Sequence, residues 1–446
     1  MTKILATLGP LLSKKKDIKF FIENCDVIRF NLSHNTLLWH KKKIDLIKKF
    51  KPEKLILVDI PGIKPRTLNE KIVNIVKGQV IGFSYYKKGK NIINLSNPLP
   101  RTENKTSFFS ISDGNYHFKF LNLSNNILWG KATQNFPLKP KKGLNIPYSI
   151  YDDEIQEKFY FSFLKKIINI KYDCIGLSFI QSYKVIEKIK KKYPEKLLIS
   201  KIENYLGYKN RISIIKSSDA IMIDRGDLSA ELGIEKLSLY SNKIIEDAKI
   251  LKKPIIIATE NLNSLIDSSL PTKSDIINLD YYLDKKIDFI MLSDETATSY
   301  FWKSTLKWLN NYLKVKKKNE NVANSFTIEK LLESLSNETV IIFSKKGFIF
   351  SKINTTNIKK IILFTENKKT YLSSKLKARV DSYLVKFPKI ALDKFLFSNI
   401  KNLSKEIFKE NKYIFLVHLM FPRKGSRANS ISMIHREDFK NSKKFY

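Results

Sequence analysis

The chain has 446 residues, enough to bury large hydrophobic cores in two or three domains. Hydrophobic residues make up 43% of it, which excludes a disordered protein, and two cysteines are too few for a disulfide framework. The net charge of +38 would fit a nucleic-acid or membrane-surface protein, but the lysines are spread from end to end and form no basic stripe with interleaved aromatic residues. We attribute this charge to A·T-rich codon usage and predict no specific nucleic-acid partner.

Short apolar runs alternate with amphipathic stretches along the chain, a pattern typical of a parallel sheet. Eight runs are predicted as strands, and they lie at residues 3–8, 27–31, 55–59, 174–179, 197–201, 220–223, 254–259 and 289–293. Nearly every run ends in a polar or charged residue. A (β/α)8 barrel carries its chemistry at the carboxyl ends of all its strands, whereas a doubly wound sheet concentrates it at one switch point. The pattern therefore favours the barrel.

The third and fourth runs are separated by too many residues for one βα loop. Residues 67–143 carry short alternating segments and turn signals but no clear long helix, which predicts an inserted β lid domain. Beyond a lysine-rich linker, the runs at 339–343, 360–364 and 413–417 indicate a separate α/β domain. We expect a catalytic barrel over 1–66 and 144–318, the lid over 67–143 and the C-terminal domain over 319–446. Apart from the βα unit, we identify no internal repeat.

The N-terminal residues enter the first predicted strand directly, without the charged and apolar regions of a signal peptide. We find no apolar run of about 18 residues, the length that a membrane-spanning helix needs. The expected location is therefore the cytoplasm, with no membrane partner.

Two neighbouring predicted strands end in charged residues. Lys201 and Glu203 project from the same face of one strand, because side chains alternate along it. About two dozen residues later, a second apolar run is followed by Arg225, Gly226 and Asp227. A lysine and two carboxylates at adjacent strand ends suit Mg²⁺-assisted phosphoryl transfer. Two buried structural salt bridges are the alternative interpretation.

Together with these residues, further segments resemble the pyruvate kinase family over the full length of the chain and in the family's order. The segments are Thr2–Pro10, Arg29–His34, Asp59–Thr67, Lys201–Asn204, Arg225–Leu228, Ala258–Thr259 and Met291–Ala297. The resemblance implies an α/β fold: a (β/α)8 TIM barrel with an inserted small β-barrel lid domain and a C-terminal α/β domain. It implies transfer of the phosphoryl group of phosphoenolpyruvate to ADP, giving pyruvate and ATP, and a homo-oligomer, a tetramer by analogy.

The resemblance also assigns the reaction chemistry. Glu203 and Asp227 are expected to hold Mg²⁺, for which Mn²⁺ could substitute, since carboxylate oxygens are suitable ligands. Lys201 is expected beside the transferred phosphoryl group, and the guanidinium of Arg29 suits a bidentate phosphate contact. Thr259 resembles the residue that flanks the face on which the enolate is protonated, so its hydroxyl is the candidate proton donor. The alternative is a strand-end hydroxyl that is hydrogen-bonded only to the backbone.

The remaining substrate positions follow from the same resemblance. They are Gly226, Arg225 and Ser178 for the phosphate or substrate, and His34, Arg66 and Asp113 for the nucleotide. Asp113 can equally be a turn aspartate, because it lies between a serine and a glycine.

Much of the family holds K⁺ at the positions of Asn31, Ser33, Asp59 and the carbonyl of Ile60. In those relatives a nearby glutamate makes the ion necessary, and the matching position here is Lys64. Its ammonium group supplies the charge that K⁺ would bring. We therefore expect no K⁺ requirement.

Three additional carboxylates depart from the family pattern. Asp224 stands where the family generally has a small residue, Glu260 replaces a glutamine and Asp294 replaces a glycine. Extra negative charge weakens anion binding unless it is neutralised. Because the Lys201, Glu203 and Asp227 set is intact, we predict an active enzyme. The rivals are a decayed, non-catalytic barrel acting as a basic binding protein and a Mg-dependent lyase-type barrel for phosphoenolpyruvate or pyruvate.

Overall fold

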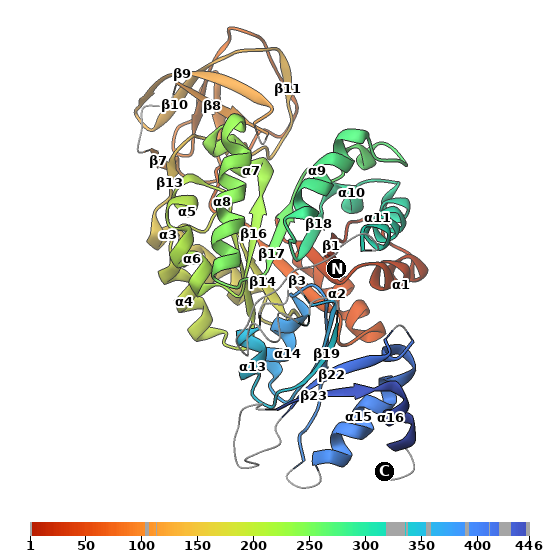
Figure 1. The fold of residues 1–446 in the computed structure, drawn as a ribbon. Helices are drawn as coiled ribbons and strands as arrows, with labels where there is room; N and C mark the ends of the chain where they lie inside the picture. The colour runs from red at the N-terminus through yellow and green to blue at the C-terminus, as the bar shows by residue number, and fades with distance from the viewer. Residues whose placement is uncertain are drawn as a thin grey trace. The chain divides into compact units, whose positions relative to one another are not determined.

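The computed structural model describes residues 2–102, 107–112, 114–317, 335, 338–353, 358–388, 392–409, 411–418 and 430–442 (Figure 1). Two compact units make up the chain: Ile4–Leu306, and Met1–Lys3 with Lys307–Tyr446. The finer domain boundaries expected from the sequence stay predictions. Within the described helices, we find none with both the length and the apolar character needed to cross a membrane.

Eight parallel strands close into a barrel, as predicted, and follow one another around it in chain order until β18 meets β1. They are β1 (Lys3–Thr7), β2 (Val27–Asn31), β3 (Leu55–Ile60), β14 (Cys174–Leu177), β15 (Leu197–Ile202), β16 (Ala220–Asp224), β17 (Ile255–Ala258) and β18 (Phe289–Leu292). Strands β3, β15 and β16 are buried along their whole length. Burial on both faces explains why such strands are continuous apolar runs in the sequence.

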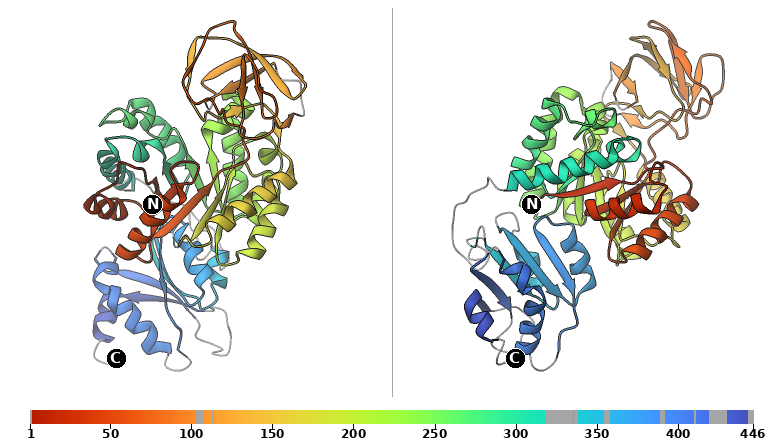
Figure 2. Two further views of the ribbon diagram at one scale, coloured as in Figure 1. Left: turned by 180° about the vertical axis from the view of Figure 1, so that it is seen from behind. Right: turned by 90° about the vertical axis from the view of Figure 1, so that its right-hand side faces the viewer.

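The helices lie outside the ring of strands (Figures 1 and 2). They are α1 (Lys15–Asn24), α2 (Leu37–Phe50), α3 (Asp153–Lys166), α4 (Tyr183–Lys192), α5 (Tyr205–Lys209), α6 (Arg211–Ser217), α7 (Arg225–Leu232), α8 (Leu237–Ile250), α9 (Lys273–Asp284), α10 (Asp294–Ala297) and α11 (Trp302–Lys317), with short 3₁₀ turns η1 (Ile234–Lys236) and η2 (Asn263–Ile266). Helix α1 buries Ile18, Phe21 and Ile22, which the helical period places on one face. Helix α9 begins at a capping box of Thr272 and Asp275.

Four aspartates clip neighbouring strands together at the amino end of the barrel. Each directly precedes β2, β14, β16 or β18, and its carboxylate accepts a backbone N–H from the preceding strand of the ring. The pairs are Asp26 with Ile4 (2.8 Å), Asp173 with Ile56 (2.9 Å), Asp219 with Leu198 (3.0 Å) and Asp288 with Ile255 (2.9 Å). In return, the N–H of each aspartate donates to the carbonyl of the same partner residue. Each clip therefore satisfies both backbone groups of one strand residue.

The four clips share the sequence Asp-x-Ile, which recurs at residues 26–28, 173–175, 219–221 and 288–290. This pattern was not predicted from the sequence, where only the βα unit was identified as a repeat. An aspartate before a strand resembles ordinary turn chemistry, so its recurrence becomes meaningful only once the ring of strands is known.

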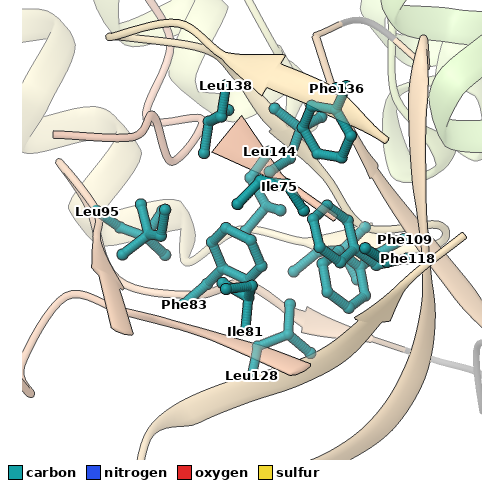
Figure 3. Packing of buried hydrophobic residues seen from close by; sticks show 14 residues of the cluster. Ile75, Ile81, Phe83, Leu95, Phe109, Phe118, Leu128, Phe136, Leu138 and Leu144 are labelled. Carbon is teal, nitrogen blue, oxygen red and sulfur yellow. The ribbon is translucent and has the colours of Figure 1, made fainter. Parts of the chain in front are cut away.

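A small β domain lies between β3 and β14 in the chain. Its six-stranded sheet contains, in spatial order, β12 (Leu144–Asn145), β8 (Phe108–Ile111), β9 (Tyr116–Ser124), β10 (Ile127–Ala132), β5 (Val80–Ser84) and β6 (Ile92–Asn94). Two further pairs join β4 (Val73–Ile75) to β11 (Phe136–Leu138) and β7 (Arg101–Thr102) to β13 (Ser149–Ile150). The core packs the rings of Phe83, Phe109 and Phe118 against one another (Figure 3). The described part of residues 67–143 contains no helix, as expected.

The C-terminal unit contains a five-stranded sheet in the order β21-β20-β19-β22-β23. Its elements are β19 (Thr339–Phe343), α13 (Phe348–Lys352), β20 (Lys360–Thr365), α14 (Lys368–Lys375), β21 (Val380–Leu384), α15 (Leu392–Ile407), β22 (Tyr413–His418), β23 (Ser430–His435) and α16 (Arg436–Ser442). The three predicted strands are confirmed as β19, β20 and β22. Strands β21 and β23 were missed, because both are partly exposed edge strands without a continuous apolar run.

We expect Asp219→Ala to destabilise the protein by about 1–3 kcal/mol, because it leaves the buried N–H of Leu198 unpaired. The exposed Asp267 provides a matched control in Asp267→Ala. Urea unfolding followed by circular dichroism measures both changes. Equal losses of stability in the two variants would contradict a structural role for the clip.

Candidate functional site

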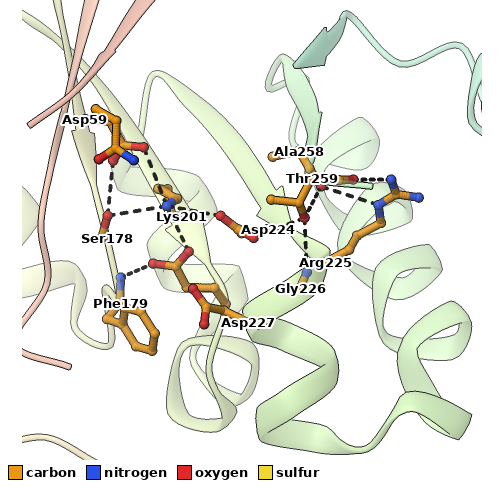
Figure 4. A network of polar contacts seen from close by, with 12 residues as sticks. Asp59, Ser178, Phe179, Lys201, Asp224, Arg225, Gly226, Asp227, Ala258 and Thr259 are labelled. Carbon is orange, nitrogen blue, oxygen red and sulfur yellow. Dashed lines mark hydrogen bonds and ion pairs between the residues drawn. The ribbon is translucent and has the colours of Figure 1, made fainter. Parts of the chain in front are cut away.

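Lys201 lies at the centre of a buried polar cluster at the carboxyl ends of β3, β15 and β16 (Figure 4). Its Nζ is 3.0 Å from Glu203 Oε2, 3.2 Å from Asp224 Oδ2 and 3.6 Å from Asp59 Oδ2. It also donates to Ser178 Oγ at 3.4 Å. The structure therefore brings together Lys201, Glu203, Asp59 and Ser178, four of the residues singled out from the sequence.

The charges of this cluster support one another. Burial alone lowers the pKa of Lys201, but the surrounding carboxylates outweigh it and hold this pKa well above its ordinary value. Burial likewise raises the pKa of Asp59, while Lys201 and Arg29 bring it below its ordinary value. The site therefore holds a permanent cation, as the stabilisation of a transferred phosphoryl group requires.

Arg29 is buried in the middle of β2, and two of its guanidinium nitrogen atoms contact Asp59. Its Nε donates to Asp59 Oδ2 at 2.8 Å, and Nη2 lies 2.6 Å from the same oxygen. Nη1 donates to Thr7 Oγ1 at 2.9 Å, and Thr7 donates in turn to the carbonyl of Leu292 at 2.8 Å. Asp59 is thus shared by Arg29 and Lys201, which places both cations on one side of the barrel mouth.

Three carboxylates could hold a divalent metal ion. Glu203, Asp224 and Asp227 each offer an oxygen, and these oxygens lie within 4.8 Å of one another. Glu203 Oε1 accepts the N–H of Phe179 at 2.6 Å, whereas Oε2 faces Lys201 Nζ at 3.0 Å. Burial raises the pKa of Glu203, and the neighbouring carboxylates add to this effect. Hard oxygen atoms with spare acceptor capacity fit Mg²⁺, whose charge would hold Glu203 ionised.

Lys64 lies on the predicted metal ligand Asp227. The buried side chain of Lys64 forms a short ion pair with the partly buried Asp227, and Asn145 Nδ2 lies 3.4 Å from the same carboxylate oxygen. Burial raises the pKa of Asp227, but Lys64 outweighs it and lowers this pKa below its ordinary value. The Lys64 side chain passes close to Gly143, where an added Cβ would lie 2.7 Å from Lys64 Cε. Sequence reasoning placed Lys64 with the K⁺ ligands and did not anticipate this pairing.

The residues expected around a monovalent cation occupy the ends of β2 and β3. Asn31 Oδ1 accepts the N–H of Ser33 at 3.1 Å, and Ile60 pairs with Leu177 of β14. Asp59 lies nearby in the ring but is bound by Arg29 and Ser178. Its charge is therefore already compensated by a protein cation.

Thr259 follows β17 in a left-handed backbone conformation. Its φ is 60° and that of Glu260 is 52°, values that residues with a Cβ rarely adopt. The Thr259 hydroxyl accepts the N–H of Gly226 at 3.0 Å and lies 3.2 Å from Asp224 Oδ1 and 2.7 Å from the Ala258 carbonyl (Figure 4). Asp224 therefore connects this hydroxyl to Lys201.

Arg225 holds the strained turn from the other side. Its buried guanidinium donates to the carbonyls of Thr259 and Ala258 and to Asn278 Oδ1, the last at 2.7 Å. These contacts direct it away from Lys201, although the sequence assigned it to phosphate. The N–H of Gly226 is bound by Thr259, and a Cβ at Gly226 would meet only ordinary contacts at 3.7 Å and 3.8 Å. Contacts with the protein therefore do not explain this glycine.

The predicted nucleotide residues lie near the connection to the β domain. His34 is exposed, and partial desolvation of its ring, followed by the charge of Arg66, lowers its pKa below the ordinary value. Arg66 Nη1 donates to the carbonyl of Lys141 at 3.3 Å. Asp113 lies outside the described residues.

Sequence reasoning missed a buried carboxylate behind Asp227. Glu231 lies four residues further along α7, and Ser149 Oγ donates to its Oε2 at 2.7 Å. Its Oε1 and the hydroxyl of Tyr151 are buried without a hydrogen-bond partner in the described part of the chain. Burial raises the pKa of Glu231 to about 8. The spacing of four residues, which places Glu231 and Asp227 on one helix face, was the available signal.

The raised pKa of Glu231 predicts a loss of stability with rising pH. Between the ordinary value of 4.5 and about 8, the folded protein keeps a proton that the unfolded chain releases. Stability therefore falls as pH rises through this window. Glu231→Gln should be more stable than the wild type at pH near 9 and lose this advantage near pH 5, as thermal unfolding at both pH values can show. A stability difference independent of pH would contradict this assignment.

Comparisons with known proteins agree with the resemblance on which the site residues were assigned. The family model "Pyruvate kinase, barrel domain" matches residues 1–306. A pyruvate kinase of Thermococcus litoralis is 30% identical over 319 residues, 66% of this chain and 65% of that protein. A pyruvate kinase of Thermotoga maritima is 27% identical over 97% of this chain and 99% of its own length. The crystal structure of a pyruvate kinase from Cryptosporidium parvum shares the fold, with a TM-score of 0.81, 22% identity and coverage of 97% and 96%.

Proposed function

The chain belongs to the pyruvate kinase family, phosphotransferases of glycolysis that form pyruvate and ATP from phosphoenolpyruvate and ADP, and we propose that Lys201, Arg29 and Thr259 carry this reaction here. The supporting observation is the buried ammonium of Lys201, held among carboxylates at the carboxyl ends of the barrel strands. Active sites of barrels of this kind lie at these strand ends.

Phosphoryl transfer breaks the bond between phosphorus and the enolate oxygen and forms a bond from phosphorus to a β-phosphate oxygen of ADP. Negative charge is then spread over the oxygens of the moving group. Lys201 and Arg29 are fixed by their shared partner Asp59, so they can stabilise this charge without reorganising. The enolate left behind takes a proton at its carbon. We assign this proton to the Thr259 side, where the hydroxyl lies near Asp224.

Members of this family generally need a divalent metal ion. We propose Mg²⁺, with Mn²⁺ as a substitute, and Glu203 and Asp227 as its protein ligands. Bound there, the ion would neutralise substrate oxygens. The clustering of the carboxylate oxygens of Glu203, Asp224 and Asp227 supports this choice.

The remaining assignments concern the substrates and the state of the protein. We infer that His34, Arg66 and Asp113 face ADP, while Gly226 and Ser178 surround the phosphate or substrate and Arg225 shapes the adjoining turn at Thr259. A homo-oligomer, a tetramer by analogy, and a cytoplasmic location are also proposed. Relatives from tobacco and Arabidopsis are named cytosolic isozymes, whereas another tobacco relative is chloroplastic.

An assay for ATP formation from phosphoenolpyruvate and ADP tests the proposal against its rivals. The proposed enzyme forms ATP and pyruvate in equal amounts. A lyase-type barrel would consume phosphoenolpyruvate or pyruvate without ADP, and a non-catalytic barrel would do neither. Either result would overturn the assignment.

Loss of a metal ligand should nearly abolish turnover. We expect Glu203→Gln and Asp227→Asn to lower kcat by roughly two orders of magnitude with little loss of folding, since a carboxamide is a poor substitute for a carboxylate ligand. The exposed Glu235 provides the control variant Glu235→Gln. Steady-state rates at saturating Mg²⁺ measure the effect, and near-normal turnover of either ligand variant would contradict the ligand assignment.

Lys64 should make the enzyme independent of K⁺. In a tetramethylammonium buffer without K⁺, we expect activity comparable to that with K⁺, because a buried ammonium already supplies the positive charge. Lys64→Glu should require K⁺, whereas Lys71→Glu, at an exposed lysine, should not. Activation of the unmodified protein by about tenfold or more with K⁺ would show that Lys64 lacks this role.

A further inference from the structure

Asp224 is the last residue of β16 and is buried at the mouth of the barrel. Its two carboxylate oxygens face different partners. Oδ2 lies 3.2 Å from Lys201 Nζ, and Oδ1 lies 3.2 Å from Thr259 Oγ1 (Figure 4). One side chain therefore spans the residue assigned to the phosphoryl group and the residue assigned to the enolate.

The contact with Thr259 controls where one hydrogen atom points. A hydroxyl has a single hydrogen to donate, and Thr259 can direct it to Asp224 Oδ1 or to the Ala258 carbonyl. Because the N–H of Gly226 already donates to the hydroxyl oxygen of Thr259, the hydroxyl hydrogen has few orientations left. A charged acceptor forms the stronger bond, so Asp224 draws the hydroxyl hydrogen from the backbone carbonyl toward the site.

The neighbouring residue reinforces this arrangement. Arg225 holds the carbonyl of Thr259, while Asp224 holds its hydroxyl. The backbone between these two contacts is in the left-handed region, a conformation that costs free energy unless its surroundings impose it. Two consecutive side chains of the β16–α7 connection therefore grip Thr259 at two points.

The contact with Lys201 has an electrostatic consequence. Asp224 is one of three carboxylates within 3.6 Å of this ammonium, together with Glu203 and Asp59. Each carboxylate fixes Lys201 more firmly but also reduces its attraction for a phosphate. Asp224 thus lowers the affinity of the site for a phosphate-bearing substrate while it holds Lys201 in a fixed position.

We propose that Asp224 is a positioning residue that fixes Lys201 and Thr259 relative to each other, so that phosphoryl transfer and protonation of the enolate occur in one preset geometry. The proposal rests on the function proposed above. The protonation step can be measured separately, as exchange of the methyl hydrogens of pyruvate in D₂O. In this exchange a methyl C–H bond breaks, its proton leaves on the Thr259 side, and a solvent deuteron adds to the same carbon, with no change in oxidation state.

Two substitutions separate the contributions of charge and hydrogen bonding. Asp224→Asn retains an oxygen that can accept from Thr259 but loses the negative charge beside Lys201. Asp224→Ala loses both. Glu260→Gln is the matched control, because Glu260 is also an additional carboxylate next to Thr259 but is exposed. For each variant, ATP formation gives kcat and the KM for phosphoenolpyruvate. Proton NMR in D₂O with pyruvate, Mg²⁺ and inorganic phosphate gives the rate of methyl exchange.

We expect methyl exchange to fall by about tenfold or more in Asp224→Ala and to stay within about threefold of the wild type in Asp224→Asn, because only the alanine variant releases the hydroxyl. Both variants should lower the KM for phosphoenolpyruvate, since both remove negative charge beside Lys201. Glu260→Gln should change neither quantity by more than about twofold. A merely structural role would not separate exchange from KM in this way.

Wild-type exchange in Asp224→Ala, or equal losses in both Asp224 variants, would overturn the proposal. An unchanged or raised KM in Asp224→Asn would overturn its electrostatic half. Circular dichroism checks the folding of each variant, and Asp224→Ser replaces Asp224→Ala in the same comparison if the latter unfolds. A wild-type protein without ATP formation would instead refute the proposed function, so the two failures are distinguishable.

Discussion

The pairing of one buried ammonium group with three carboxylates organises the mouth of this barrel. Asp59 lies in β3, Glu203 directly follows β15 and Asp224 ends β16. The charge of Lys201 is therefore compensated only when β3, β14, β15 and β16 pair in register. Replacing a buried ionic cluster by apolar side chains is often neutral or stabilising. Its presence at the strand ends is therefore better explained by chemistry than by stability, and the family membership of the chain agrees with this view.

The same cluster links parts of the site that lie on different elements. Asp59 joins Lys201 to Arg29 on one side, and Asp224 joins it to the strained turn at Thr259 on the other. Beyond Glu203, the carboxylate of Asp227 is held by Lys64, which lies in the segment leading into the β domain. A metal ion that binds Asp227 would therefore either displace the ammonium group of Lys64 or share the carboxylate with it. Metal binding at Asp227, as proposed, would thereby be coupled to the conformation of this connecting segment.

Much of this arrangement could be predicted from the sequence, because parallel strands buried on both faces produce apolar runs with polar ends. The barrel strands were located to within one or two residues, and the meeting of Lys201 with Glu203 followed from alternation along β15. The directions of long side chains could not be predicted in this way. Arg225 turns toward Thr259, and Lys64 reaches Asp227, because tertiary partners rather than local spacing decide where a flexible chain points. Asp224 was identified only as a source of unfavourable charge, since its two partners are adjacent only in three dimensions.

The four aspartate clips differ in how far apart their partners lie along the chain. Three of them join residues 22, 21 and 33 positions apart, whereas Asp173 and Ile56 are separated by 117 positions. Closing the longer loop costs more chain entropy, so the β3–β14 seam is the slowest of the four to form by a random search. Lys48 adds an ion pair of 2.8 Å to Asp173 at this seam. Folding of the inserted β domain would bring the two ends of the seam together, which gives that domain a part in assembling the barrel.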